Sequence, residues 1–110
     1  MIRNLEKDWR ERVVKNNLDL IVLKFLRYKP RWGYEVNIAI RDRYQVYLSA
    51  GSLYPLLHEL EENGYIQGEW EERGRGRRIY SITESGIQFL EFGEHATIEI
   101  ARLLEGHRVA

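Results

Sequence analysis

The sequence predicts a mainly α fold with a small β-hairpin, which places it in the α+β class. Apolar residues recur at helical spacing in several segments, and after Gly64 the spacing changes to the two-residue period of β-strands. The chain has 110 residues, of which 44% are hydrophobic and 31% are charged. These values indicate one globular domain with a modest core.

Two helical patterns occupy the first quarter of the chain. Near its start, apolar residues recur every four positions and predict one face of an amphipathic helix: Leu5, Trp9 and Val13. Residues 17–28 are apolar on most sides, which is typical of a buried helix. Asn17 could cap a new helix there, or the first helix could run through it, and the sequence leaves both open.

Pro30 and Gly33 mark the end of the buried helix. Residues 33–44 predict a short helix with three inward-facing side chains, Val36, Ala39 and Ile40. Residues 45–48 then predict a short extended strand before the next helix begins.

The next helix has an apolar row at positions i, i+3, i+4 and i+7: Leu53, Leu56, Leu57 and Leu60. Ser49 suits its N-cap position. If Ser52 caps it instead, Pro55 falls in the first turn, where its missing N–H has no cost. Both starts direct the leucine row toward the core.

A β-hairpin follows Gly64. Two-residue alternation puts Ile66, Gly68 and Trp70 on one face of the first strand, and Arg78, Tyr80 and Ile82 on one face of the second. The glycine-rich tip lies between them, and residues 73–78 hold four arginines and no acid. Thr83 then suits the N-cap of a last helix, with Glu84 near its positive end.

Three compact helices followed by a two-stranded hairpin have the layout of a winged helix-turn-helix. Residues 1–82 therefore predict a winged-helix domain with an N-terminal helix extension. Residues 83–110 predict a C-terminal dimerisation helix.

The helix with the leucine row has an unusual outward side. Its N-terminal half is uncharged and carries hydrogen-bonding groups, and its acids lie toward the C-terminal end. A helix that enters a DNA groove by its N-terminus offers free N–H groups and the positive end of its dipole. An ordinary polar surface would explain the helix alone, but the arginine-rich hairpin that follows suits phosphate contacts and narrow minor grooves.

Three segments resemble the PadR family of winged helix-turn-helix transcriptional regulators: GSLYPLLHELEENGYI from residue 51, WGYE from residue 32 and GRRIYSITESG from residue 76. The resemblance covers roughly residues 18–86. It implies a repressor that acts as a homodimer, and a symmetric dimer would match the two half-sites of a pseudo-palindromic operator. The single helix after Thr83 matches the small subtype of the family, which differs from relatives with a larger C-terminal region.

Carried onto this sequence, the family pattern makes residues 1–82 a winged helix-turn-helix DNA-binding domain, with the recognition helix within residues 51–66 and the arginine-rich hairpin as the wing. It puts Tyr34, in the GYE motif, near a phosphate-contacting position. The candidate DNA-contacting residues are Tyr34, Ser49, Gly51, Ser52, Tyr54, Pro55, His58, Arg73, Arg75, Arg77 and Arg78.

The last helix has more apolar surface than one small domain covers. Its polar residues form one narrow stripe: Gln88, Glu91, His95, Glu99 and Arg102. The remaining positions are mostly apolar, so one side should pack on its own domain and another on a second subunit. The candidate dimer-interface residues are Leu5, Trp9, Val13, Ile87, Leu90, Gly93, Ile100, Ala101 and Leu104.

Other classes of function have weak support. The sequence contains no nucleotide-binding or nucleophile motif, so we expect neither an enzyme nor a cofactor. Glu91, His95 and Glu99 have the spacing of one helix face, but they lie in the polar stripe and are too few for a typical metal site. With no cysteine, no membrane-length apolar run and a charged N-terminus, we expect a cytoplasmic protein that does not enter membranes.

Two further interpretations remain open. Winged helices also serve as protein-interaction modules without DNA binding, and the balance of 17 basic and 17 acidic residues suits that alternative slightly. The family resemblance also suggests a hydrophobic or aromatic small-molecule effector. Trp9, Trp32 and Trp70 could contribute to such a site, although aromatic residues more often fill cores and interfaces.

Overall fold

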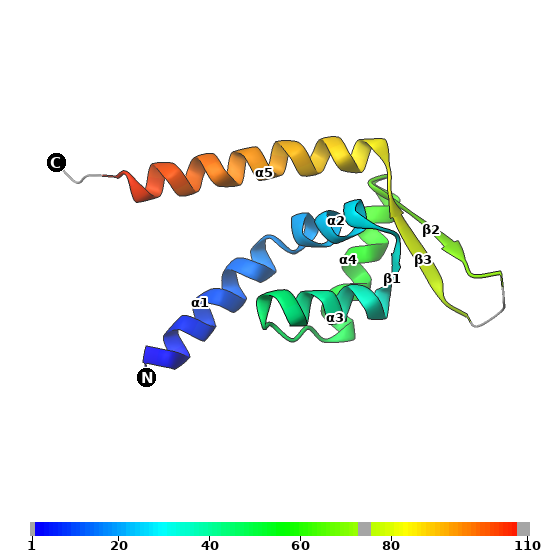
Figure 1. The fold of residues 1–110 in the computed structure, drawn as a ribbon, viewed down its shortest axis with the longest axis horizontal. Coiled ribbons are helices and arrows are strands. Elements are labelled where there is room, and N and C mark those ends of the chain that lie inside the picture. Colours follow the sequence, from blue (N-terminus) through cyan, green and yellow to red (C-terminus); the bar gives the residue numbers. More distant parts are fainter. Residues whose placement is uncertain (1, 73–75, 108–110) are drawn as a thin grey trace.

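Five helices and one three-stranded antiparallel sheet make up residues 2–72 and 76–107, the parts of the chain that this computed structural model describes (Figure 1). In chain order the elements are α1 (Ile2–Asn16), α2 (Leu18–Tyr28), β1 (Arg31–Trp32), α3 (Gly33–Tyr44), α4 (Ala50–Glu62), β2 (Ile66–Trp70), β3 (Arg78–Ile82) and α5 (Glu84–Glu105). The fold is the expected mainly α one with a small sheet.

The core lies where α2, α3 and α4 meet the base of the sheet. The leucine row of α4 faces it as expected: Leu53, Leu57 and Leu60 are buried, and Leu56 is partly buried. Ile66 and Tyr80 close the core from the sheet side. Because α4 is fixed along its apolar row, its opposite side is presented to solvent.

The helix is interrupted between α1 and α2, and no side chain caps the start of α2. Asn17 lies between the two helices, and its Nδ2 donates to the carbonyl oxygen of Val13 at 2.8 Å. The backbone amide of Asn17 also donates to Val13, at 3.1 Å, so the α1 turn continues up to the break. Two helices with a sharp join therefore resolve the ambiguity that the sequence leaves open.

The sheet has the strand order β1-β3-β2. The hairpin register pairs Gly68 with Tyr80 and Trp70 with Arg78, in agreement with the two expected faces. The expected strand at residues 45–48 is wrong, because this segment pairs with no strand in the described parts of the chain. Instead Arg31 and Trp32 form β1, and two residues after a proline are too few to show periodicity.

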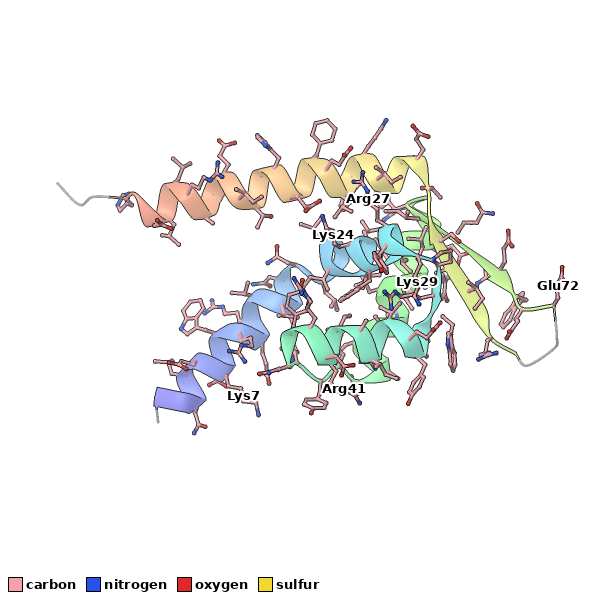
Figure 2. All side chains as sticks on the ribbon, viewed as in Figure 1. Lys7, Lys24, Arg27, Lys29, Arg41 and Glu72 are labelled. Atoms are coloured by element: carbon pink, nitrogen blue, oxygen red, sulfur yellow. The ribbon has the colours of Figure 1, made fainter. Side chains whose placement is uncertain are left out.

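α5 begins at the expected cap and packs on α2 with its first half. The Oγ1 of Thr83 accepts a hydrogen bond from the amide of Gly86 at 3.1 Å. Lys24 and Arg27 point from α2 toward α5 (Figure 2), where they pair with Glu94 at 2.9 Å and Glu91 at 3.4 Å. In the parts that the structure describes, no helix is long and apolar enough to cross a bilayer.

Candidate nucleic-acid interface

The exposed side of α4 carries its neutral residues at the N-terminal end. Ser49 occupies the N-cap position, and its Oγ lies 3.2 Å from the Oγ of Ser52. The other expected contact residues of this helix are also exposed: Gly51, Ser52, Tyr54, Pro55 and His58. The acids come later, where His58 pairs with Glu62 at 2.8 Å. This end of α4 therefore presents donors without carboxylates.

Pro55 lies inside α4 rather than in its first turn, because the helix begins at Ala50. A proline has no N–H to donate to the carbonyl four residues earlier. The carbonyl of Gly51 therefore lacks the helical donor that any other residue at position 55 would supply.

Tyr54 joins the start of α4 to the start of α3. A Cβ atom on Gly33 would lie 2.6 Å from Cε1 of Tyr54, so the ring rests against the backbone of Gly33. The amide of Trp32 donates to the Oε1 of Glu35 at 3.2 Å, which caps the start of α3. Two helix N-termini are thus held together, and each has a positive dipole end.

Tyr34 extends this surface toward the sheet. It is exposed, and the centre of its ring lies 5.2 Å from that of Trp32 on β1. The guanidinium of Arg77 covers the Trp32 ring at 4.8 Å. One line of contacts therefore runs from Tyr54 on α4, through the start of α3, to Arg77 near the tip of the hairpin.

The four hairpin arginines divide into two groups. Arg73 and Arg75 lie outside the described residues. Arg77 binds both carboxylate oxygens of Glu71, at 2.7 and 2.9 Å. Arg78 binds the carboxylate of Glu61 on α4. The two described arginines are therefore engaged within the chain and are only partly exposed.

The terminal helices leave a wide apolar groove. About 720 Å³ of space lies between α1, α2 and α5, and its lining includes Trp9, Val13, Leu20, Phe25, Leu90 and Ile98. From His95 to the end of α5 every residue is exposed. Figure 1 shows α1 and the second half of α5 extending from the domain on the side away from the hairpin.

The candidate interface residues on these helices differ in their exposure. Leu5, Trp9, Val13, Ile100, Ala101 and Leu104 are exposed, whereas Ile87 is partly buried. Leu90 is fully buried in the core of the single chain. A Cβ atom on Gly93 would lie 2.5 Å from Leu20, so Gly93 allows close packing on α2 of its own chain. The first half of α5 therefore packs on its own domain, and its second half is exposed to solvent.

The sequence model of the Transcriptional regulator PadR-like family matches residues 22–92. This chain belongs to that family. The match includes α3, α4 and the hairpin, which carry the surface described above.

Several known transcriptional regulators resemble the chain over more than half of its length. A transcriptional regulator from Clostridium thermocellum superposes with a TM-score of 0.78 and 26% identity, covering 84% of this chain and 94% of that one. A PadR family regulator from Eggerthella lenta gives a TM-score of 0.76 at 25% identity, covering 94% and 84%. The transcriptional regulator Rv3488 of Mycobacterium tuberculosis is 38% identical over 66 residues, which are 59% of this chain and 62% of that protein.

The protein is thus a PadR-like transcriptional regulator with a DNA-binding winged helix-turn-helix fold, and its family is one of regulators rather than enzymes.

Sequence reasoning missed Ile98, which lines the groove, and Glu61 and Glu71, which hold two of the arginines. The excess of apolar residues on α5 pointed toward the first of these. Nothing in the charge pattern identified the carboxylates, because opposite charges in a sequence do not reveal which ones meet in space. Within residues 2–72 and 76–107, no three potential metal ligands come together.

Proposed function

We propose that the protein represses transcription by binding a pseudo-palindromic DNA operator as a homodimer. The observation that carries this proposal is the line of contacts from Tyr54 through Gly33 to Trp32 and Arg77. It joins the neutral end of α4, the start of α3 and the hairpin into one surface. Duplex DNA would meet all three at once, with α4 in the major groove and the hairpin on the flanking backbone.

The residues of this surface would have different tasks. The side chains of Ser52, Tyr54 and His58 would read base edges, with Gly51 and Pro55 allowing close approach. Ser49 and Tyr34, at the starts of α4 and α3, would bind phosphates near the positive helix ends. The hairpin arginines outside the described residues, Arg73 and Arg75, would bind backbone phosphates without sequence preference.

Dimerisation would use the terminal helices. The groove between α1, α2 and α5 and the exposed half of α5 form an apolar surface too large for a small monomer in water. A second copy related by a two-fold axis would cover it and would place two α4 helices about 34 Å apart, one helical turn of DNA. In this scheme residues 1–82 bind DNA and residues 83–110 dimerise. A regulator of this kind would act in the cytoplasm and needs no catalytic activity or cofactor.

Substitutions on α4 should separate sequence reading from general affinity. We expect Ser52→Ala and Tyr54→Ala to change the preferred operator bases, with a loss of about 1–3 kcal/mol on the cognate site and little on random DNA. Selection of bound sequences from random duplexes, followed by gel shifts over a salt series, would measure both. Ser85→Ala is the matched control, because Ser85 is exposed at the start of α5 and lies outside this surface. A salt slope near zero for the unaltered protein would contradict phosphate binding.

The same groove would accommodate a hydrophobic or aromatic effector at the dimer interface. Trp9 lines it, whereas Trp32 and Trp70 lie on the sheet. We expect aromatic cations and phenols that bind there to quench tryptophan fluorescence, and Trp9→Phe to remove most of that quenching. Equal quenching in the Trp9→Phe protein would place the compounds elsewhere.

A further inference from the structure

We infer that Glu61 and Arg78 form a clamp that fixes the hairpin at a set angle to α4, so that Arg78 positions the DNA-reading elements and does not itself bind phosphate. The inference rests on the proposed DNA binding. It reverses the role that the sequence suggests for Arg78, and it gives a function to the acidic end of α4.

The two residues connect different elements. Glu61 is in the last turn of α4, and Arg78 begins β3. The Nη2 of Arg78 donates to Oε2 of Glu61, and its Nε lies 3.4 Å from Oε1. The two side chains are only 29% and 28% exposed, so this pair is better shielded than the other α4 pair, His58–Glu62. A two-point contact of this kind restricts rotation as well as separation.

Glu61 also holds the free edge of the hairpin. β2 is an edge strand, because the order is β1-β3-β2. In an antiparallel hairpin, every second residue of a strand hydrogen-bonds to the opposite strand, and Tyr65 and Glu71 occupy such positions. Gly68 lies at an intervening position, so its amide points away from β3. That amide donates instead to Oε2 of Glu61 at 3.3 Å. One carboxylate on α4 therefore binds both strands of the hairpin.

The local sequence provides the space for this contact. A Cβ atom on Gly68 would lie 2.5 Å from Nε of Arg78, so only glycine lets the guanidinium cross the strand. Trp70 then covers the guanidinium, with its ring centre 5.3 Å away. The alternation of Gly68 and Trp70 on one face thus has a specific role next to Arg78.

The electrostatics oppose phosphate binding at Arg78. Its hydrogen bond with Glu61 lowers the pKa of that carboxyl and raises the pKa of the guanidinium, so both groups stay charged near neutral pH. The hollow beside them, about 430 Å³, is lined by His58, Glu61, Glu62, Arg78 and Tyr80. The carboxylates of Glu61 and Glu62 both line this hollow beside Arg78, and their negative charges would repel an incoming phosphate.

The direction in which Glu61→Ala changes DNA affinity distinguishes the two roles of Arg78, phosphate ligand and clamp. If Arg78 is a phosphate ligand that Glu61 restrains, Glu61→Ala should tighten DNA binding. If the pair is a clamp, Glu61→Ala should weaken operator binding by about tenfold, because the hairpin loses its fixed angle. Glu59→Ala is the matched control, since Glu59 is an exposed carboxylate near the same end of α4 and does not line the hollow beside Arg78. It should leave affinity unchanged or slightly improved.

Arg78→Ala allows a second measurement, the salt dependence of DNA binding, which a loss of stability alone would not change. Loss of a phosphate contact lowers the slope of log affinity against log salt by about 0.9, whereas loss of a clamp leaves the slope unchanged. The double variant Glu61→Ala/Arg78→Ala should bind as weakly as either single variant, since one interaction is lost in all three. Melting curves would confirm that each variant is folded at the assay temperature.

Tighter binding by Glu61→Ala than by Glu59→Ala, or a reduced slope for Arg78→Ala, would overturn the clamp and leave the proposed function standing. Failure of the unaltered protein to bind any duplex at low salt would overturn both. The expected pattern, weaker binding with an unchanged slope, supports the clamp alone.

Discussion

Replacing Ile98 with aspartate is expected to make the protein monomeric and to lower its affinity for a palindromic operator at least about 100-fold. Ile98 is 49% exposed in the single chain and lines the groove with Trp9 and Val13. In a dimer that covers this groove, the new carboxylate would be buried without a partner, at a cost of several kcal/mol. Analytical ultracentrifugation would measure the association state, and gel shifts would measure binding to one and two half-sites.

His95→Asp is the control for added charge on the same helix. His95 lies in the polar stripe of α5 beside Glu99, so this change should leave the dimer intact. If Ile98→Asp weakens binding to the full operator but leaves affinity for a single half-site unchanged, the variant has lost dimerisation and not its contacts with the DNA groove. An Ile98→Asp protein that remains dimeric at micromolar concentration would contradict an interface in the groove.

Most of the fold could be predicted from the sequence, because its helices carry strong periodic patterns. The i, i+3, i+4, i+7 leucine row located α4 and its buried side, and Thr83 located the start of α5. β1 could not be predicted, since two residues contain no period and the strand exists only because β3 lies beside it. Residues 45–48 look extended for a different reason: Val46 and Leu48 are buried by the helices around them, and Gln45 ends α3 with a left-handed φ of 57°.

The candidate site shows the same division between local and distant information. Exposure of the neutral end of α4 followed from the helix period, and the structure agrees at Ser52 and Tyr54. The pairing of Arg78 with Glu61 did not follow, because Glu61 is 17 residues away on another element. A run of basic residues predicts a positive surface only where the fold brings no carboxylate to meet it.

In α5, one property followed from the local sequence and another depended on distant residues. Its excess of apolar residues predicted two packing surfaces, and the structure assigns Leu90 and Gly93 to the surface within the chain. The helical period alone could not make that assignment, because it does not show that the first half of α5 packs on α2 while α1 turns away after the break at Asn17 (Figure 1). The exposed remainder, with Ile100 and Leu104, is what the proposed dimer would cover.

The largest loss of stability should come from Gly86→Ala. Gly86 is buried in the first turn of α5, where a Cβ atom would collide with the carbonyl group of Tyr65 and approach the side chain of Ile82 at 2.7 Å. The Tyr65 carbonyl cannot move aside freely, because it accepts a hydrogen bond from the amide of Thr83 at 3.1 Å. Overpacking of this kind costs about 1–3 kcal/mol or more. Thermal unfolding by circular dichroism should show Tm lowered by roughly 5–15 °C.

Gly51→Ala provides the opposite expectation for the same chemical change. Gly51 is exposed in α4, and the nearest atom to an added Cβ would be 3.8 Å away, in Ser49. With no collision, the better helix propensity of alanine should raise stability by about 0.5–1 kcal/mol. Because Gly51 faces the proposed DNA surface, the same variant should bind the operator less well despite its higher Tm. Equal Tm shifts for Gly86→Ala and Gly51→Ala would show that the junction of the hairpin with α5 is looser than its contacts imply.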